Sequence, residues 1–266
     1  MPFFSIITVT LNARPGLART LESILAQSFN DWELVIKDGG STDGTREWLE
    51  ALADPRIRVV TQPDDGIYSA MNQALRIASG RFVHFLNADD VYAVPEALAA
   101  IANAARANPN AGFIYSDYVN DRIGMPVRYP ARLSGWFLFR NMVCHQAQFL
   151  SRELFDRFGV YDETLKIGAD RDFALRVLRN GVPAAHVRAT LVRYRDGGFS
   201  ARRIDLRDAE HHRILRHHFS AGERLLFGML DLATFRPLRV YLYQHCRHQR
   251  WFRAWSRIRN AVSSRI

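Results

Sequence analysis

With 266 residues, 48% of them hydrophobic, the chain can bury a substantial core and form one large α/β domain, alone or with an appendage. Residues 1–200 carry 22 basic and 22 acidic side chains, so the formal charge of +9 belongs to residues 201–266, with 14 Arg against 5 acidic residues. A nucleic-acid-binding protein with a basic surface throughout is therefore disfavoured.

The cysteines and the apolar runs indicate a cytoplasmic protein. Cys144 and Cys246 are far apart and form no metal-ligand pattern, which favours a reducing compartment. The first residues do not combine a basic segment with a long apolar run, so we expect no signal peptide. No apolar run approaches the roughly 20 residues that a membrane-spanning helix needs.

The first half of the chain alternates between two hydrophobic patterns. Short apolar runs predict strands at 4–10, 32–36, 57–60 and 81–86. Helical spacing predicts helices at 12–27, 45–53 and 67–78. In the first of these helices the apolar positions are Leu17, Leu21, Ile24 and Leu25. Such alternation is typical of parallel βαβ units in an α/β fold.

The second half is less regular. It predicts helices at 95–107, 151–158 and 170–179, strands at 112–118 and about 185–188, and extended segments near 126–130 and 146–150. From residue 203 onward the pattern is helical and rich in arginine. We therefore expect a first domain at 1–202 and a basic helical extension at 203–266.

An acidic cluster follows the fourth predicted strand. Asn87, Ala88, Asp89 and Asp90 come directly after the apolar run at 81–86, at the carboxyl edge of the expected sheet, where ligands bind in open α/β sheets. Two carboxylates and an amide oxygen are suitable ligands for Mg²⁺ or Mn²⁺, and such a cation can bind a diphosphate. The alternative is a plain turn, since Asn and Asp favour turns for local reasons.

Polar side chains also end the first two strands. Thr8, Thr10 and Asn12 close the first strand, and Asp38 closes the second, before a glycine-rich turn at 39–44. Together they suit a nucleotide pocket, in which Asp38 accepts a hydrogen bond from a uracil ring. The alternative is a strand-to-helix turn that Asp38 caps. Neither a dinucleotide fingerprint nor a Walker phosphate loop is present.

Two helices add candidate residues. Tyr68 and Asn72 are one helical turn apart and can point together at a ligand, although core packing explains them equally well. Asp170, at the start of a predicted helix, is a candidate general base or merely a helix cap. Asp172 points elsewhere and is expected to form a salt bridge.

Two further segments are weaker candidates for contacts with a phosphate or an acceptor. His145 and Gln146 form the first. The second contains Gly198 and Ser200, in a loop that we expect to act as a lid with glycine hinges. For each segment, a purely structural role is at least as well supported by the sequence as contact with a ligand.

Four segments together resemble the family 2 glycosyltransferases, which have the GT-A nucleotide-sugar fold, a mostly parallel sheet flanked by helices. They are residues 5–12 (SIITVTLN), 38–45 (DGGSTDGT), 65–72 (DGIYSAMN) and 85–90 (FLNADD). With the segment around Asp170, they cover about residues 3–200. Their order and spacing carry the resemblance, which none of them would carry alone.

The resemblance implies an inverting transferase that moves one sugar from a nucleotide-diphosphate sugar, with UDP favoured, to an acceptor hydroxyl. It implies that Asp38 contacts the nucleobase and that Asp170 is the base. It also implies that Asp89 belongs to the Asp-x-Asp element that binds Mn²⁺ or Mg²⁺ and the diphosphate, with Asp90 as a further metal ligand. Asn87 departs from the family pattern, since it replaces the first Asp of Asp-x-Asp. A second departure is Ala169, where many members have Glu.

The motif of processive members is also missing, since Gln249-Arg250-Trp251 only superficially resembles part of Gln-x-x-Arg-Trp. The resemblance therefore implies that one sugar is added per encounter. By analogy, the product is a bacterial surface polysaccharide or glycolipid, and the acceptor is a saccharide or a lipid-linked saccharide.

The extension at 203–266 mixes arginine with large apolar and aromatic side chains, such as Leu225, Phe227 and Trp251. Basic amphipathic helices of this kind suit an anionic membrane surface, here the inner face of the cell membrane. The alternatives are packing on the first domain or a dimer contact.

Three other functions are compatible with the sequence. A non-catalytic nucleotide-sugar binder is compatible with Asn87. A nucleotidyltransferase normally needs a basic glycine-rich loop after the first strand, where this chain has residues 11–16 (LNARPG). A nucleic-acid-binding protein is the least favoured, because the positive charge is confined to residues 201–266.

Overall fold

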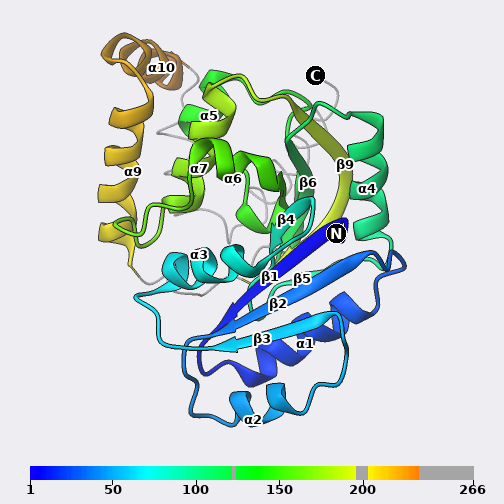
Figure 1. Cartoon of the computed structure of the whole chain (residues 1–266). Coiled ribbons are helices and arrows are strands. Elements are labelled where there is room, and N and C mark those ends of the chain that lie inside the picture. Colours follow the sequence, from blue (N-terminus) through cyan, green and yellow to red (C-terminus); the bar gives the residue numbers. More distant parts are fainter. Residues whose placement is uncertain (122–123, 196–202, 234–266) are drawn as a thin grey trace. The chain divides into compact units, whose positions relative to one another are not determined.

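The computed structural model describes residues 1–121, 124–195 and 203–233 (Figure 1). Its first half is the expected βαβ alternation. The parallel strands are β1 (Phe4–Thr10), β2 (Trp32–Asp38), β3 (Ile57–Thr61) and β4 (Phe82–Phe85). Three helices connect them, namely α1 (Arg14–Leu25), α2 (Thr45–Glu50) and α3 (Ile67–Ile77).

The second half extends the same sheet with mixed pairing. Its strands are β5 (Val91–Tyr92), β6 (Phe113–Asn120), β7 (Met125–Val127), β8 (Gln148–Ser151) and β9 (Ala184–Tyr194). The strand order is β3-β2-β1-β4-β8-β6-β9-β5, with β7 paired to β6. β8 runs antiparallel to β4 and β6, whereas β6 and β9 are parallel. The fold class is thus α/β, as the sequence predicts.

The remaining helices follow in the second half of the chain. They are α4 (Ala97–Ala107), α5 (Gly135–Arg140), the short 3₁₀ helix η1 (His145–Ala147), α6 (Arg152–Phe158), α7 (Ala169–Arg179), α9 (Ile204–His218) and α10 (Ala221–Ala233). Along the described part of the chain, no helix combines the length and the apolar character needed to cross a bilayer.

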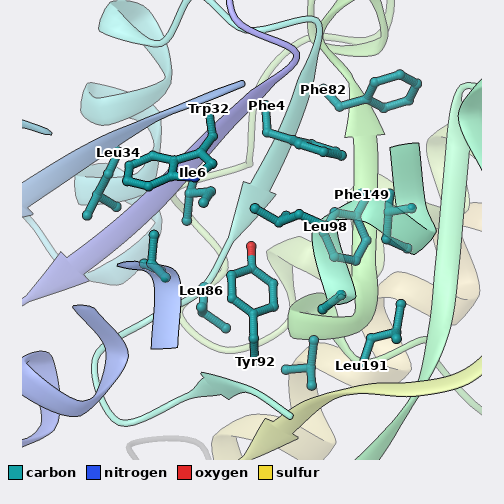
Figure 2. Close-up of a cluster of buried hydrophobic side chains, with 14 of the residues drawn as sticks. Phe4, Ile6, Trp32, Leu34, Phe82, Leu86, Tyr92, Leu98, Phe149 and Leu191 are labelled. Carbon is teal, nitrogen blue, oxygen red and sulfur yellow. The ribbon is translucent and has the colours of Figure 1, made fainter. Parts of the chain in front are cut away.

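Alternating side chains of the central strands explain why helices cover both faces of the sheet. Phe4 and Ile6 of β1 point into a hydrophobic cluster with side chains from β2, β4, α1 and α4 (Figure 2). Trp32 and Leu98 are part of this cluster and are almost fully buried. α3 contacts β1 and β2 and contributes its own buried face, which includes Met71. Because both faces are covered, β1 and β2 are buried along their whole length.

The sequence misses the elements that depend on distant partners. β5 has two residues and pairs only with β9, about 100 residues later, so no local pattern marks it. α5 has six residues, too few for helical periodicity to show. Leu25, expected on the buried face of α1, is the last residue of that helix and is 46% exposed.

Internal contacts divide the chain into residues 1–214 and 215–266. The sequence-based boundary between 202 and 203 falls earlier, ahead of α9. Most of α9 thus belongs with the sheet, and Glu210 from this helix is buried.

Candidate active site

The loops after β1 and β2 are joined by side-chain hydrogen bonds. The buried Asp38 carboxylate accepts from the backbone N–H groups of Gly40 (3.1 Å) and Ser41 (3.0 Å), and from the Ser41 hydroxyl. Asn12 donates its backbone N–H to Ser41 Oγ (2.8 Å), and its side-chain oxygen accepts from Thr42 N (2.8 Å). Asp38 and Asn12 therefore shape one loop pair at the carboxyl edge of the sheet, and the contact of Asp38 with a nucleobase stays a prediction.

The two threonines of β1 differ in their partners. Thr8 Oγ1 donates to the backbone oxygen of Leu86 (2.7 Å), so it supports the end of β4. Thr10 Oγ1 is buried without a hydrogen-bond partner among the residues that the structure describes. Of the two, Thr10 is thus the one that retains hydrogen-bonding capacity at the edge where the nucleotide pocket is predicted.

Lys37 lies beneath this edge and has no accessible surface. Its ammonium group donates to the backbone oxygens of Asp38 (3.0 Å) and Gln62 (2.6 Å) and to Asp64 Oδ2 (2.9 Å). The ammonium thereby joins the ends of β2 and β3. The sequence analysis did not predict Lys37 as a residue that supports the site. Its position directly before Asp38 in the chain could have identified it.

Asp89 has a left-handed backbone (φ 82°) and an exposed carboxylate, which forms ion pairs with Arg19 and with Arg195 (3.2 Å). The carboxylate lies against the first turn of α1, where a Cβ added at Gly16 would come within 2.5 Å of it. The glycine is therefore required by the close approach of Asp89. The two arginines are 70 and 106 residues from Asp89 in the chain, and the sequence did not reveal them.

Asp90 has a different environment. Its carboxylate is buried and accepts from Gln146 Nε2 (2.7 Å) and from the backbone N–H of Arg195 (3.0 Å). Burial raises the pKa of Asp90 to about 6. Since both carboxylate oxygens are already hydrogen-bonded inside the protein, Asp90 braces the loop after β4, and this geometry gives no support to its predicted role as a metal ligand.

Asn87 begins a line of hydrogen bonds that reaches Asp170. Asn87 Nδ2 lies 3.2 Å from His145 Nε2, and His145 Nδ1 lies 3.2 Å from Asp170 Oδ2. Since an amide nitrogen can only donate, His145 Nε2 accepts and His145 Nδ1 carries the proton that faces Asp170. The other Asp170 oxygen lies 3.0 Å from the Tyr68 hydroxyl. The structure thus brings together four of the predicted site residues.

Tyr68 remains a donor at this position. Burial and the neighbouring Asp170 carboxylate raise the pKa of Tyr68 well above its usual value. Its hydroxyl also lies 2.5 Å from the backbone oxygen of Ile167, three residues before Asp170. Tyr68 therefore contacts Asp170 and the loop that leads to it, and its predicted contact with a nucleotide stays a prediction.

Asn72 is engaged elsewhere. Its amide donates to the backbone oxygen of Tyr161 (2.9 Å) and to Glu163 Oε1 (2.9 Å), and its side-chain oxygen accepts from Tyr161 N (3.1 Å). Asn72 is almost fully buried. These bonds hold the loop before α7, and they give no support to the expected nucleotide contact.

Gln146 and Ala88 are also built into the interior. Besides its bond to Asp90, Gln146 accepts at its backbone oxygen from the fully buried His84 (2.8 Å). Burial lowers the pKa of His84 to about 3, so His84 is neutral. Ala88 is partly buried, and its side chain packs against the hydrophobic cluster. Only its backbone is therefore suited to contact a ligand. Gly198 and Ser200 lie outside the described residues.

The donor set for a divalent cation is small. In the described part of the chain, no three His, Cys, Asp or Glu side chains gather as metal ligands. The partly exposed Asp89 carboxylate offers a hard oxygen ligand at the sheet edge. One protein carboxylate fits a cation whose remaining ligands are diphosphate oxygens and water, which is common for Mg²⁺. The residues therefore fit a metal that arrives with a diphosphate ligand.

Comparisons with known proteins agree with this arrangement. The family model described as glycosyl transferase family 2 matches residues 5–158. A PGL/p-HBAD biosynthesis glycosyltransferase of Mycobacterium tuberculosis is 33% identical over 214 residues, which cover 77% of this chain and 81% of the relative. The putative teichuronic acid biosynthesis glycosyltransferase TuaG of Bacillus subtilis is 45% identical over 92 residues, 34% of this chain and 36% of TuaG.

Two solved structures share the fold. S. aureus TarS 1–349 in complex with UDP-GlcNAc gives a TM-score of 0.64 at 20% identity, over 73% of this chain and 59% of that one. The mannosyltransferase PcManGT from Pyrobaculum calidifontis, in complex with GDP-Man and Mn²⁺, gives a TM-score of 0.61 at 25% identity. The match covers 79% of this chain and 62% of the mannosyltransferase chain. The parallel sheet, its polar carboxyl edge and these matches lead to one conclusion. The chain belongs to glycosyl transferase family 2 and is a glycosyltransferase with a GT-A fold.

Proposed function

We propose that the protein moves one sugar from a UDP-sugar to an acceptor hydroxyl with inversion at the anomeric carbon. The observation that carries this proposal is the hydrogen-bonded line from Asn87 through His145 to Asp170. It connects the loop expected to hold the diphosphate with the carboxylate expected to act as base. A transferase needs these two groups on either side of the reacting carbon.

Asp170 takes the proton from the acceptor hydroxyl, and the oxygen attacks the anomeric carbon from the face opposite the diphosphate. The bond between this carbon and the diphosphate oxygen breaks, and the nucleoside diphosphate leaves with the bonding electrons. The backbone N–H of Arg171 (2.8 Å) donates to Asp170 Oδ1, the Tyr68 hydroxyl lies 3.0 Å from the same oxygen, and the His145 Nδ1–H faces Oδ2, so the base is oriented before the acceptor binds. The nearly buried position of Asp170 keeps bulk water from the proton transfer.

Asp89 is the residue that would hold Mn²⁺ or Mg²⁺ together with the donor diphosphate. A bound cation would supply Lewis-acid stabilisation of the negative charge on the leaving diphosphate. Arg19 and Arg195, which pair with Asp89 in the free protein, become available to phosphate oxygens once Asp89 takes another partner. The Mn²⁺ named for the mannosyltransferase complex supports this assignment.

The names of relatives support a role in bacterial surface glycan synthesis. The mycobacterial relative is named for PGL/p-HBAD biosynthesis, and TuaG for teichuronic acid biosynthesis. TarS complexes contain UDP-GlcNAc or UDP, which supports a UDP-sugar donor, whereas the PcManGT complex contains GDP-Man. The acceptor is then a saccharide or a lipid-linked saccharide.

Thermal unfolding with UDP, GDP, dTDP and CDP, each with and without Mn²⁺, tests the donor site. A nucleotide at 100 times its dissociation constant stabilises by about 2.7 kcal/mol, which raises the melting temperature by about 5–10 °C. We expect the largest shift with UDP and Mn²⁺. A larger shift with another nucleotide would contradict the UDP assignment, and no shift with any would contradict the donor site.

A non-catalytic nucleotide-sugar binder is the second candidate, because Asn87 replaces an acidic residue of the family pattern. Its side chain bonds to His145, and with an ionised Asp at this position a neutral His145 could donate to that Asp or to Asp170 but not to both. Release of UDP from UDP-sugars distinguishes the two candidates, since a binder would release none.

We also propose that the extension binds an anionic membrane. α10 has no buried residue, and five of its large apolar side chains are exposed, namely Leu225, Leu226, Met229, Leu230 and Leu232. Residues 234–266 add eight Arg and no acidic residue. An apolar helix followed in the sequence by concentrated positive charge suits an anionic bilayer surface. This surface would bring the enzyme to a lipid-linked acceptor at the inner face of the membrane.

Co-sedimentation with vesicles of 30% phosphatidylserine, against pure phosphatidylcholine, measures this interaction. We expect the full chain to pellet with the anionic vesicles, and a chain lacking residues 222–266 to stay in solution. Salt should weaken binding, because charge contributes to it. Equal binding of the two chains would contradict the proposal.

A further inference from the structure

Glu210 of α9 lies outside the segment that the family model matches, and no part of the proposed chemistry uses it. Its carboxylate accepts from three consecutive backbone N–H groups, those of Lys166 (2.7 Å), Ile167 (2.9 Å) and Gly168 (2.9 Å). The side chain is buried. Three converging amides form an anion-binding nest, here filled by a carboxylate of the same chain.

The nest lies directly before the proposed base. Gly168 is the residue before α7, and Asp170 is the second residue of that helix. Gly168 also permits the close approach of α9, because an added Cβ would lie 2.7 Å from Ile214 Cδ1. The distance from this Cβ to Glu210 Oε2 would be 3.6 Å.

One peptide group is held from both sides. The carbonyl oxygen of Ile167 faces the Tyr68 hydroxyl at 2.5 Å, and the N–H of Gly168, in the same peptide unit, donates to Glu210 at 2.9 Å. The same Tyr68 hydroxyl lies 3.0 Å from Asp170 Oδ1. A rotation of this peptide would therefore move the hydroxyl that orients Asp170.

We infer that Glu210 is a positioning residue for the catalytic base, supplied by the helix that follows the sheet. This inference rests on the proposed role of Asp170. Glu210 fixes the loop at 166–168 and thereby the entry into α7. Replacing one of its two acceptor oxygens leaves at least one of the three N–H groups without an acceptor and loosens the loop that holds the peptide group next to Tyr68. A displacement of about 1 Å at a reacting group can cost about 10²-fold in rate.

The first test is hydrogen exchange in full-length Glu210→Gln, since the glutamine keeps one acceptor oxygen but places an amide nitrogen against N–H donors. We expect the amides of residues 166–168 to exchange about 10- to 100-fold faster. Asp208→Asn is the matched control, because Asp208 is on the same helix, is exposed and pairs only locally with Arg207. Unchanged exchange in Glu210→Gln would overturn the inference.

Turnover provides the second test, measured as UDP release from the UDP-sugar that the protein hydrolyses fastest. We expect Glu210→Gln to lower kcat by about 10- to 100-fold while the UDP dissociation constant stays within about twofold. In the Asp170→Asn background, the same substitution should have little further effect, because a positioning residue acts through the base. Additive losses would indicate a general structural role and overturn the inference.

The outcomes separate this inference from the proposed function. Normal turnover in Asp170→Asn would remove the base and with it the proposed mechanism. Loss of turnover in Asp170→Asn, but not in Glu210→Gln, would overturn the positioning role alone. If Glu210→Gln does not fold, Glu210→Asp keeps the charge but shortens the side chain by one methylene group, so the carboxylate no longer reaches the three N–H groups of residues 166–168. It should then lower kcat in the same way, and an unchanged kcat would overturn the inference.

Discussion

The Asp170→Asn variant is expected to lose about 10²- to 10⁴-fold in turnover and to bind UDP as tightly as the original chain. Asparagine has nearly the same shape as aspartate but cannot take a proton from the acceptor. Its amide oxygen can still accept from the Tyr68 hydroxyl, although its NH₂ group then faces His145 Nδ1 and the hydrogen bond to His145 is lost. UDP release from a UDP-sugar, with and without acceptor, measures the first effect, and the UDP-dependent melting shift measures the second.

Asp172→Asn is the matched control for this variant. Asp172 lies on the same helix, but its carboxylate pairs with Arg176 at 2.8 Å, in the salt bridge that the sequence predicts. The control should retain turnover but lose stability, because Asp172 is buried and its substitution removes the carboxylate that pairs with Arg176. Equal turnover in the two variants would remove Asp170 from the mechanism.

The Asp89→Asn variant is expected to lose the Mn²⁺-dependent part of the UDP-induced melting shift. We also expect turnover to fall by about 10²- to 10³-fold, because the charge on the leaving diphosphate is no longer offset. The substitution removes the partly exposed carboxylate in the loop after β4 and leaves Arg19 and Arg195 without this acidic partner. The freed arginines can pair with UDP phosphates directly, so metal-independent UDP binding should persist or increase.

Asp90→Asn distinguishes the two adjacent acids. Since the Asp90 carboxylate is buried against Gln146 and the Arg195 backbone, its substitution should lower the melting temperature but keep the Mn²⁺-dependent shift. The opposite pattern, in which Asp90→Asn abolishes the shift and Asp89→Asn keeps it, would assign the metal to Asp90.

Much of the fold could be predicted from the sequence because it is encoded locally. The apolar runs of β1 and β2 and the helical spacing of α1 and α3 are visible in windows of about ten residues. The four strands that form the parallel part of the sheet were predicted to within two residues at each end. β5 could not be predicted, because a two-residue strand is defined only by its pairing with β9. α5 could not be predicted either, because six residues are too few to show a helical period.

The candidate site was only partly predictable, because its residues exchange hydrogen bonds over long stretches of chain. Asp170 and Tyr68 are 102 residues apart and meet at 3.0 Å. His145 was a weak candidate in the sequence and lies between Asn87 and Asp170 in the structure. Nothing in the local pattern of α9 marks Glu210 as the partner of a loop more than 40 residues earlier.

By itself, the sequence determined the α/β class, the order of the parallel strands along the chain and the acids that follow them, because periodicity and turn chemistry act between near neighbours. Only the tertiary structure separated Asp89, exposed between two arginines, from Asp90, buried against Gln146. Adjacent residues of a turn point in different directions, and the side chains that contact each of them come from distant parts of the chain. Burial and hydrogen bonding across the fold, which a linear pattern does not record, therefore assign the roles of these acids.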